Sequence, residues 1–351
     1  MTPYLFLIML SLAGGLLPAD KPGYRRGFLL MTGTSCWLLA ALRYVTGFDY
    51  RFYESIFQTV SSADLSSLTN LEPGYLLLNL LVARMGGEYH TFLLLFHLLL
   101  TALIFAWIGR YSSAPWLSIY LFVTLQYFAL SMNFLRQSLA AAILLWLYPF
   151  LRSRRPLPCC GLILFASCFH RTALIMLPLS LLLCLRVSRR HYGLSALTAA
   201  AAYFLIDTLL QLAVTLFPKY QSYLGGKYWQ GNSFVYVLLP LGCFLFSLPL
   251  LCRALHEPDK PPVLINGIFY TLLLQTFITR HFILERLSIY LAFFSLLALP
   301  EAALLPGERR LSRVRTWILI AGGLAYFLFA VNQGFHGVYP YRGLWDRSLT
   351  P

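Results

Sequence analysis

The sequence predicts an all-α fold, a polytopic membrane bundle of about 12 transmembrane helices with one short helix on the outer face. Its 351 residues are 59% hydrophobic and only 11% charged, with a mean hydropathy of +0.69. These values lie far from those of soluble domains. Apolar runs of roughly 17–20 residues, long enough to cross a bilayer, recur along the whole chain. We therefore expect residues 1–351 to form a single integral membrane domain.

The net charge of +14 comes from short basic clusters between the apolar runs. Such clusters are typical of cytoplasmic loops under the positive-inside rule, whereas a nucleic-acid-binding protein would carry a basic patch on a polar domain. The seven cysteines lie within or beside apolar runs and lack the spacing to histidine that a metal site needs. The sequence therefore predicts no nucleic-acid partner, no metal and no cofactor.

The candidate membrane spans follow one another without a linker or a soluble domain. Their approximate bounds are 4–18, 27–43, 90–108, 115–131, 135–151, 158–169, 172–185, 192–217, 234–252, 263–279, 286–300 and 315–331. With these spans all the basic loops fall on the cytoplasmic side and both termini fall outside. These loops contain Lys21/Arg25/Arg26, Arg110, Arg152/Arg154/Arg155, Arg186/Arg189/Arg190, Arg253/Lys260 and Arg309/Arg310/Arg313/Arg315.

The apolar run 73–84 is too short to be counted among the spans. A helix of its length extends ~18 Å, against ~30 Å of hydrocarbon. Counting it as a span would also place the basic cluster 152–155 outside. We expect a helix that enters the outer face without crossing, within an extracytoplasmic segment 43–89, and that ends at Arg84 before Gly86.

The run 158–185 predicts a short helical hairpin. Basic clusters flank it on both sides, so the chain must leave the cytoplasmic face and return to it. Each arm has about 14 residues and reaches only ~21 Å. The apex, Phe169-His170-Arg171, is therefore expected in a depression below the outer surface.

Ionisable residues that the apolar context does not explain collect on the predicted outer side. Such a group costs about 2.5–3.5 kcal/mol at membrane depth, so it usually faces a cavity that has a function. Simpler interpretations remain open for three of them. Arg43 can extend to the interface from the end of its span, Asp49 can cap a helix, and Glu72 can favour the helix that begins at Pro73.

Arg136 and His170 are the more specific candidates on this side. Asn133 is the expected helix cap, which puts Arg136 in a first turn, where the helix dipole disfavours a cation. An anion bound at this helix start would make the position favourable for a cation, and arginine binds phosphate through two parallel hydrogen bonds. Pairing with another side chain is the alternative for Arg136, and a structural role is the alternative for His170.

The segment 280–286 carries a second charged group. His281 and Glu285 are four residues apart on one helical face, with Arg280 and Arg286 beside them. A salt-bridge group satisfied within itself is one interpretation. A second anion clamp is the other, because two arginines stand in an apolar context.

Four motifs, in this order, resemble the EpsG/Wzy-type polymerases of bacterial exopolysaccharide, capsule and O-antigen assembly. The resemblance covers about residues 1–300, and the tail Tyr339-Pro340-Tyr341-Arg342 is similar to the C-terminal end of that family. The motifs are Arg43…Gly47-Phe48-Asp49…Tyr53, Glu72-Pro73-Gly74-Tyr75, Arg136-Gln137-Ser138-Leu139-Ala140 and Phe169-His170-Arg171-Thr172-Ala173…Leu177-Pro178.

The resemblance implies a glycosyltransferase in the bacterial inner membrane with its active site on the extracytoplasmic face. It would transfer a growing glycan from undecaprenyl diphosphate to a sugar hydroxyl of another lipid-linked repeat unit. We expect inversion by single displacement without metal, because no dedicated nucleophile is evident. A chain-length regulator as partner is left open.

The expected site residues fall into three groups. The candidate catalytic bases are His170, Glu72 and Asp49. The candidate diphosphate-binding residues are Arg136, Arg286, Arg280 and Arg43. The candidate substrate-binding residues are Tyr75, Gln137, His281, Glu285, Tyr341 and Arg342.

Other membrane proteins of polysaccharide assembly remain alternatives. A flippase for the same lipid-linked units suits the number of spans, but it should carry polar groups at mid-membrane and usually internal repeats. An O-antigen ligase would normally have a large outer loop. A membrane O-acyltransferase that uses a cytoplasmic donor should have its histidine and arginine inside.

Overall fold

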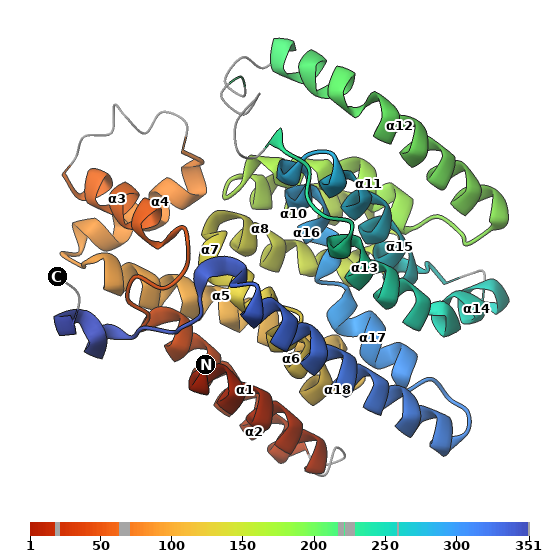
Figure 1. Ribbon diagram of the computed structural model, residues 1–351, viewed down its shortest axis with the longest axis horizontal. Helices are drawn as coiled ribbons and strands as arrows, with labels where there is room; N and C mark the ends of the chain where they lie inside the picture. The colour runs from red at the N-terminus through yellow and green to blue at the C-terminus, as the bar shows by residue number, and fades with distance from the viewer. Residues whose placement is uncertain (18–21, 63–70, 217–220, 222–228, 258–259, 350–351) are drawn as a thin grey trace. The chain divides into compact units, whose positions relative to one another are not determined.

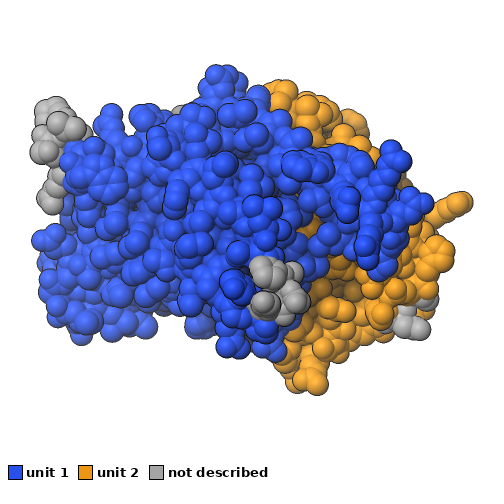
Figure 2. Space-filling view, turned by 90° about the horizontal axis from the view of Figure 1, so that it is seen from below, with its two compact units in different colours: residues 1–146, 161–174, 303–351 blue, residues 147–160, 175–302 orange. Residues whose placement is uncertain are grey.

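The computed structural model describes residues 1–17, 22–62, 71–216, 221, 229–257 and 260–349 (Figure 1). These residues form α-helices and short 3-10 turns, and no β-strand occurs among them, which confirms the all-α prediction. Lys21 and residues 63–70 of the predicted extracytoplasmic segment lie outside this description. The chain divides into two compact units, coloured separately in Figure 2. Unit 1 contains residues 1–146, 161–174 and 303–351, and unit 2 contains residues 147–160 and 175–302. That the two form one membrane domain stays a prediction.

Unit 1 is organised around the long helix α5. Its buried side chains recur every three or four residues, at Leu93, Phe96, Leu100, Ile104 and Trp107, as a helix buried along one stripe requires. Helices α2, α4 and α8 pack against it, and α6 lies between α1 and α18 (Figure 1). The bounds are α1 Thr2–Ala13, α2 Pro22–Ala41, α3 Tyr50–Ser61, α4 Pro73–Arg84, α5 Tyr89–Tyr111, α6 Pro115–Thr124, α7 Tyr127–Asn133, α8 Leu135–Leu145 and α18 Arg309–Asn332. Helix α10, Pro156–Ser167, has residues 161–167 in this unit.

The C-terminal segment of unit 1 is tied to the loop that precedes α3. The amide of Tyr44 donates to the carbonyl of Arg342 at 2.9 Å, and the amide of Leu344 donates to the carbonyl of Leu42 at 3.0 Å. The amide of Gly47 donates to the carbonyl of Gly337 at 3.0 Å. These bonds satisfy the polar backbone of a non-helical segment, which is necessary wherever water is excluded.

Unit 2 is organised around α15. Helices α11, α12, α13 and α16 pack against it. Buried Asn266 of α15 donates to the carbonyls of Leu183 and Leu185 at 3.0 and 2.8 Å, which satisfies acceptors that the end of α11 leaves open. The bounds are α9 Leu147–Arg152, α11 Met176–Leu183, α12 Arg189–Leu216, α13 Val235–Phe246, α14 Leu248–His256, α15 Val263–Thr276, α16 Glu285–Ala292 and α17 Ser295–Ala303.

Several helices have the length and composition to cross a membrane. Among the described residues these are α5, the 189–212 part of α12, and α18, or up to 6 spans if three bent helix pairs each count as one. Four shorter apolar helices, Thr2–Leu16, Pro156–Ser167, Arg171–Leu183 and Val263–Thr279, coincide with further predicted spans. The chain is an integral membrane protein by these features, whereas the number of twelve spans is not confirmed.

Candidate functional site

Glu72 lies at the position directly before α4, and its carboxylate contacts two residues from distant parts of unit 1. Oε2 accepts a hydrogen bond from Nη1 of Arg136 at 2.6 Å. Oε1 lies 3.3 Å from Nδ1 of His170 and 3.4 Å from the backbone amide of Arg171, which donates to it. Although Glu72 stands at the N-cap position of α4, its side chain makes no capping bond. Only 5% of the residue is exposed, so this is a buried, hydrogen-bonded carboxylate.

Gly74 explains how the apex of the hairpin reaches Glu72. Its amide donates to the carbonyl of Cys168 at 2.8 Å. A Cβ atom at Gly74 would lie 2.9 Å from that oxygen and 3.1 Å from the ring of Phe169. Only glycine allows this close approach, which brings His170 beside the carboxylate. The motif Glu72-Pro73-Gly74 thus supplies an acid, a helix start and a point of backbone contact.

Arg136 is the second residue of α8, as predicted, but the expected cap is wrong. The residue before α8 is Phe134, whereas Asn133 ends α7. The side-chain nitrogen Nδ2 of Asn133 donates to the carbonyl of His336 at 2.9 Å instead. A helix start therefore carries a cation that the dipole disfavours, and the charge of Glu72 compensates it. Tyr53 of α3 also hydrogen-bonds to the guanidinium of Arg136.

The charge state of Glu72 follows from these neighbours. Burial raises the pKa of its carboxyl, but the hydrogen bond to His170 and the positive charge of Arg136 outweigh burial and lower the pKa to about 2. The carboxylate is therefore ionised at neutral pH and is a weak base. It can hold and orient Arg136 and His170, and it is poorly suited to removing a proton itself.

Unit 2 contains a second charged cluster, and its central residue, Asp207, is one that sequence reasoning missed. Asp207 of α12 pairs with Arg280 through Oδ2 and lies 2.6 Å from Nε2 of His281 through Oδ1. The other ring nitrogen of His281 lies 2.6 Å from the carbonyl of Trp229, and the centroids of the two rings are 4.2 Å apart with their planes tilted by 48°. The signal for Asp207 was an isolated acid within the apolar run 192–217. Arg280 and His281 therefore pair with an acid from outside the segment, and not within 280–286 as the salt-bridge interpretation of the sequence has it.

Arg43 is placed in the interior of unit 1. Its guanidinium donates to the carbonyls of Ala40 and Met132 at 2.7 and 2.9 Å, and it lies 2.6 Å from Nε2 of His97. The residue has 0% exposure, so it does not extend to the interface. These contacts favour a structural role, and we leave Arg43 out of the diphosphate-binding set proposed below.

The remaining predicted residues have varied positions. Tyr75 is buried with its ring near those of Tyr53 and Phe92, and Gln137 is buried in α8. Asp49 stands at the N-cap position before α3 without a side-chain capping bond, and its backbone amide donates to Asn133 Oδ1 at 3.3 Å. Tyr341 donates to the carbonyl of Leu39, and the backbone of Arg342 pairs with residues 44 and 46. Glu285 and Arg286 begin α16 in unit 2.

The comparison with known families decides the assignment. The model of the EpsG family matches residues 27–342, a range that contains both charged clusters. The chain belongs to the EpsG family. No curated protein and no solved structure matches it. Membership of the EpsG family indicates a membrane protein of polysaccharide biosynthesis, and it suggests a polysaccharide polymerase.

No group of three or more histidine, cysteine, aspartate or glutamate side chains that could hold a metal ion occurs in the described part of this EpsG family member. The cationic and imidazole groups are instead paired with one carboxylate in each cluster. Stabilisation of an anion by fixed cations is the chemistry that such groups can supply.

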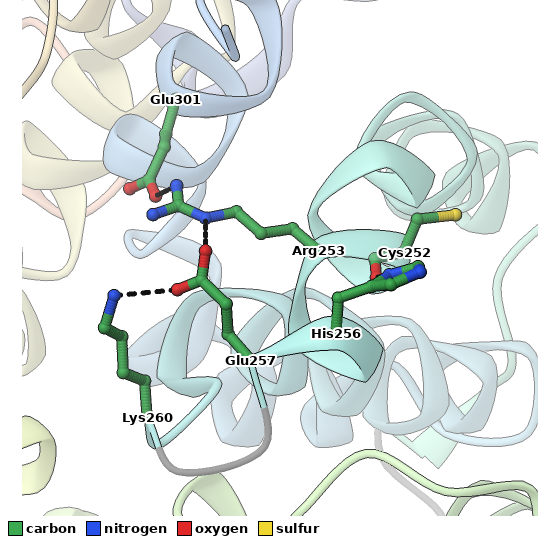
Figure 3. Close-up of polar contacts among 6 residues, drawn as sticks. All are labelled: Cys252, Arg253, His256, Glu257, Lys260 and Glu301. Atoms are coloured by element: carbon green, nitrogen blue, oxygen red, sulfur yellow. Dashed lines mark hydrogen bonds and ion pairs between the residues drawn. The ribbon is translucent and has the colours of Figure 1, made fainter.

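A third polar network lies on the side of unit 2 that the basic loops predict to be cytoplasmic (Figure 3). Arg253 of α14 lies 3.0 Å from Glu257 and 3.3 Å from Glu301 of α17, and Lys260 lies 2.8 Å from Glu257. A small cavity of about 90 Å³ adjoins these residues. Both carboxylates are paired and the network is largely exposed to solvent, so these pairs contribute little to stability. The network links α14 to α17 and is not a candidate site.

Proposed function

We propose that this EpsG family member is a glycosyltransferase that elongates a polysaccharide from undecaprenyl-diphosphate-linked repeat units. The observation that carries the proposal is the convergence of Glu72, Arg136 and His170. These residues are separated by long stretches of sequence, yet they meet as a carboxylate, a guanidinium and an imidazole within hydrogen-bonding distance. Polymerisation at a lipid diphosphate requires a cation for the leaving group and a base for the acceptor hydroxyl.

Arg136 is the proposed diphosphate-binding residue. Its guanidinium has five N–H donors, of which Glu72 and Tyr53 engage only some, so donors remain for phosphate oxygens. When the bond between the anomeric carbon and the diphosphate breaks, negative charge grows on the leaving oxygen. A cation fixed in position by Glu72 stabilises that charge without having to reorganise.

His170 is the proposed base. In the tautomer that donates Nδ1–H to Glu72, Nε2 carries the lone pair and can take the proton of the acceptor hydroxyl. The hydroxyl oxygen then forms the new glycosidic bond as the diphosphate departs with the electron pair of the old one. Direct displacement of this kind inverts the anomeric carbon. Glu72 acts as the residue that positions His170, and no role in proton transfer is assigned to Asp49.

Arg280, Arg286, His281 and Glu285 are proposed to assist with a second lipid-linked substrate. Their placement in one pocket with Arg136 stays a prediction, as do the extracytoplasmic position of the site and its independence of metal. Asp207 neutralises Arg280 in the structure, so an arriving diphosphate would have to replace that carboxylate. Tyr75, Gln137, Tyr341 and Arg342 support the fold around the site in this proposal.

The decisive experiment is reconstitution of the purified protein with defined undecaprenyl-diphosphate-linked repeat units, followed by sizing of the glycan with and without a chelator. Arg136→Ala and His170→Ala should each leave single repeat units, whereas the wild type makes long chains. Arg84→Ala, at the exposed far end of α4, is the matched control and should elongate normally. Normal chain lengths in Arg136→Ala would remove that residue from the mechanism.

The lipid-linked intermediates of cells that lack the protein separate a polymerase from a flippase or a ligase. In cells lacking the protein, a polymerase predicts single lipid-linked repeat units that accumulate facing outward, while a flippase predicts that they remain inside. A ligase predicts long chains that stay attached to undecaprenyl diphosphate. Either of the last two results would overturn the proposed reaction.

A further inference from the structure

Unit 1 contains an open groove on the face of α3 turned toward the start of α5. Its volume is about 700 Å³, within the range of small-molecule sites and large enough for several sugar rings. It is lined by Tyr44, Arg51, Glu54, Phe57, Gln58, Ser61, Ser62, Gly87, Glu88, Tyr89 and His90. The lining thus combines aromatic rings with hydroxyl, amide and carboxylate groups.

Several aromatic groups of the groove are held in place by one another. The rings of Tyr44 and His90 stack at 6.3 Å, with an angle of 23° between their planes. The hydroxyl of Tyr50, in the next layer, lies 3.1 Å from Nε2 of His90. Tyr89 is buried behind them, 5.3 Å from the ring of Tyr50. Tyr44 and His90 are only partly buried, so part of this stacked wall is accessible to a ligand.

The charge of the groove argues against a phosphate ligand. Its one guanidinium, on Arg51, pairs with Glu54 at 2.7 Å. Exposed Glu88 adds a second carboxylate, so the groove is negative when its histidine is neutral. A carboxylate offers only acceptors, whereas the exposed amide of Gln58 offers donors and acceptors, which suits sugar hydroxyls. The apolar C–H face of a sugar ring packs well on the negative face of an aromatic ring.

The groove and the Glu72–Arg136–His170 cluster both adjoin helix α3. Tyr53 of α3 hydrogen-bonds to Arg136, while Glu54, Gln58 and Ser61 of α3 line the groove. A helix with its side chains is about 10–12 Å thick. A glycan that has its reacting end at the cluster therefore needs only a few sugars to reach the groove.

We infer that this groove binds the uncharged oligosaccharide part of the substrate, a few sugars from the reacting end. The inference rests on the proposed function and adds the subsite that holds the chain between transfers. A polymerase with such a subsite retains the growing glycan and makes longer chains. Filling the groove leaves the diphosphate cluster intact, so it should shorten the product without abolishing the first transfer.

Ser61→Trp and Ser55→Trp form a matched pair that tests this subsite. Both serines are exposed on α3, but only Ser61 lines the groove. The binding probe is the repeat-unit oligosaccharide released from its lipid, titrated against the full-length protein in detergent micelles, with undecaprenyl phosphate as the second probe. Ser61→Trp should bind the oligosaccharide at least tenfold more weakly than the wild type and bind undecaprenyl phosphate normally. Ser55→Trp should bind both probes as the wild type does.

The elongation assay separates failure of this inference from failure of the proposed function. If the wild type elongates, Ser61→Trp should make short oligomers and Gln58→Ala should shift product length in the same direction. Full-length product from Ser61→Trp, or loss of undecaprenyl phosphate binding together with the oligosaccharide, would overturn the subsite. If the wild type binds both probes but does not elongate, the reaction assigned to the protein fails while the groove stands as a glycan-binding site.

Discussion

Replacing Glu72 by glutamine tests how strongly one buried carboxylate organises the cluster. The variant keeps the side-chain shape but removes the charge that Arg136 contacts at 2.6 Å. A pKa of about 2, against the ordinary value of 4.5, corresponds to about 3 kcal/mol of extra stabilisation of the ionised form in the folded state. Removing one partner of a buried pair costs about 3–5 kcal/mol. Because the side chain of Arg136 is 22% exposed, we expect a loss at the lower end of that range.

The pH dependence of this loss gives the test a definite sign. Folding lowers the pKa of Glu72, so its stabilisation is fully present above about pH 4.5, where the unfolded chain is also ionised. It is lost as the pH falls through about 2, where the folded carboxyl takes up its proton. The difference in unfolding free energy between wild type and Glu72→Gln should therefore be constant near neutral pH and shrink below about pH 4.5.

The assay is denaturant unfolding in detergent micelles, followed by tryptophan fluorescence at several pH values. Glu308→Gln, at an exposed position before α18, is the control for loss of a carboxylate and should leave stability nearly unchanged. A double-mutant cycle with Arg136→Met isolates the pair. A coupling energy below about 0.5 kcal/mol, or a Glu72→Gln deficit that does not change with pH, would refute the proposed coupling of these two residues.

Three further outcomes follow from contacts in the two units. Gly74→Ala should reduce elongation at least tenfold, because the new Cβ would lie within 3.0 Å of the backbone carbonyl oxygen of Cys168. Gly161→Ala is the control, since a Cβ there has open space around it. That variant should elongate normally, and its free energy of unfolding should rise by up to about 1 kcal/mol. Asp207→Asn should lower the unfolding midpoint in the same fluorescence assay, because Arg280 and His281 lose their carboxylate partner, and an unchanged midpoint would contradict the pairing. Arg43→Lys should lower the unfolding midpoint, because lysine cannot bond to both carbonyls that the guanidinium contacts. The folded fraction of this variant should make chains of normal length. Short chains would indicate that Arg43 takes part in the reaction.

Local chemistry made the helices of this protein predictable. Long apolar runs must be helical in lipid because their backbone groups have no other partners. The run after Glu72 illustrates this, since α4 begins at Pro73 and ends at Arg84 as expected. Arg136 likewise lies in the first turn of its helix. The prediction for Asn133 failed because a short helix, α7, ends at this residue, and the Asn133 side chain donates to the backbone carbonyl of His336.

The partners of the charged residues could not be predicted in the same way. Arg136 and Glu72 are 64 residues apart, and Arg280 and Asp207 are 73 apart. Nothing in the spacing of either pair sets its distance in space, because that distance depends on how several helices pack. Asp207 in particular could be recognised as unusual within an apolar run but not matched to its partners.

The sequence by itself determined that the chain is helical, that it belongs in a membrane, and which ionisable residues are out of place there. These properties depend on the solvation of consecutive residues, so each can be judged within one helix. Only the tertiary structure decided that Glu72 faces Arg136 and His170 while Arg43 is enclosed by carbonyl groups. A buried charge is stabilised by whichever groups packing brings within about 3–4 Å, and that choice is made between helices.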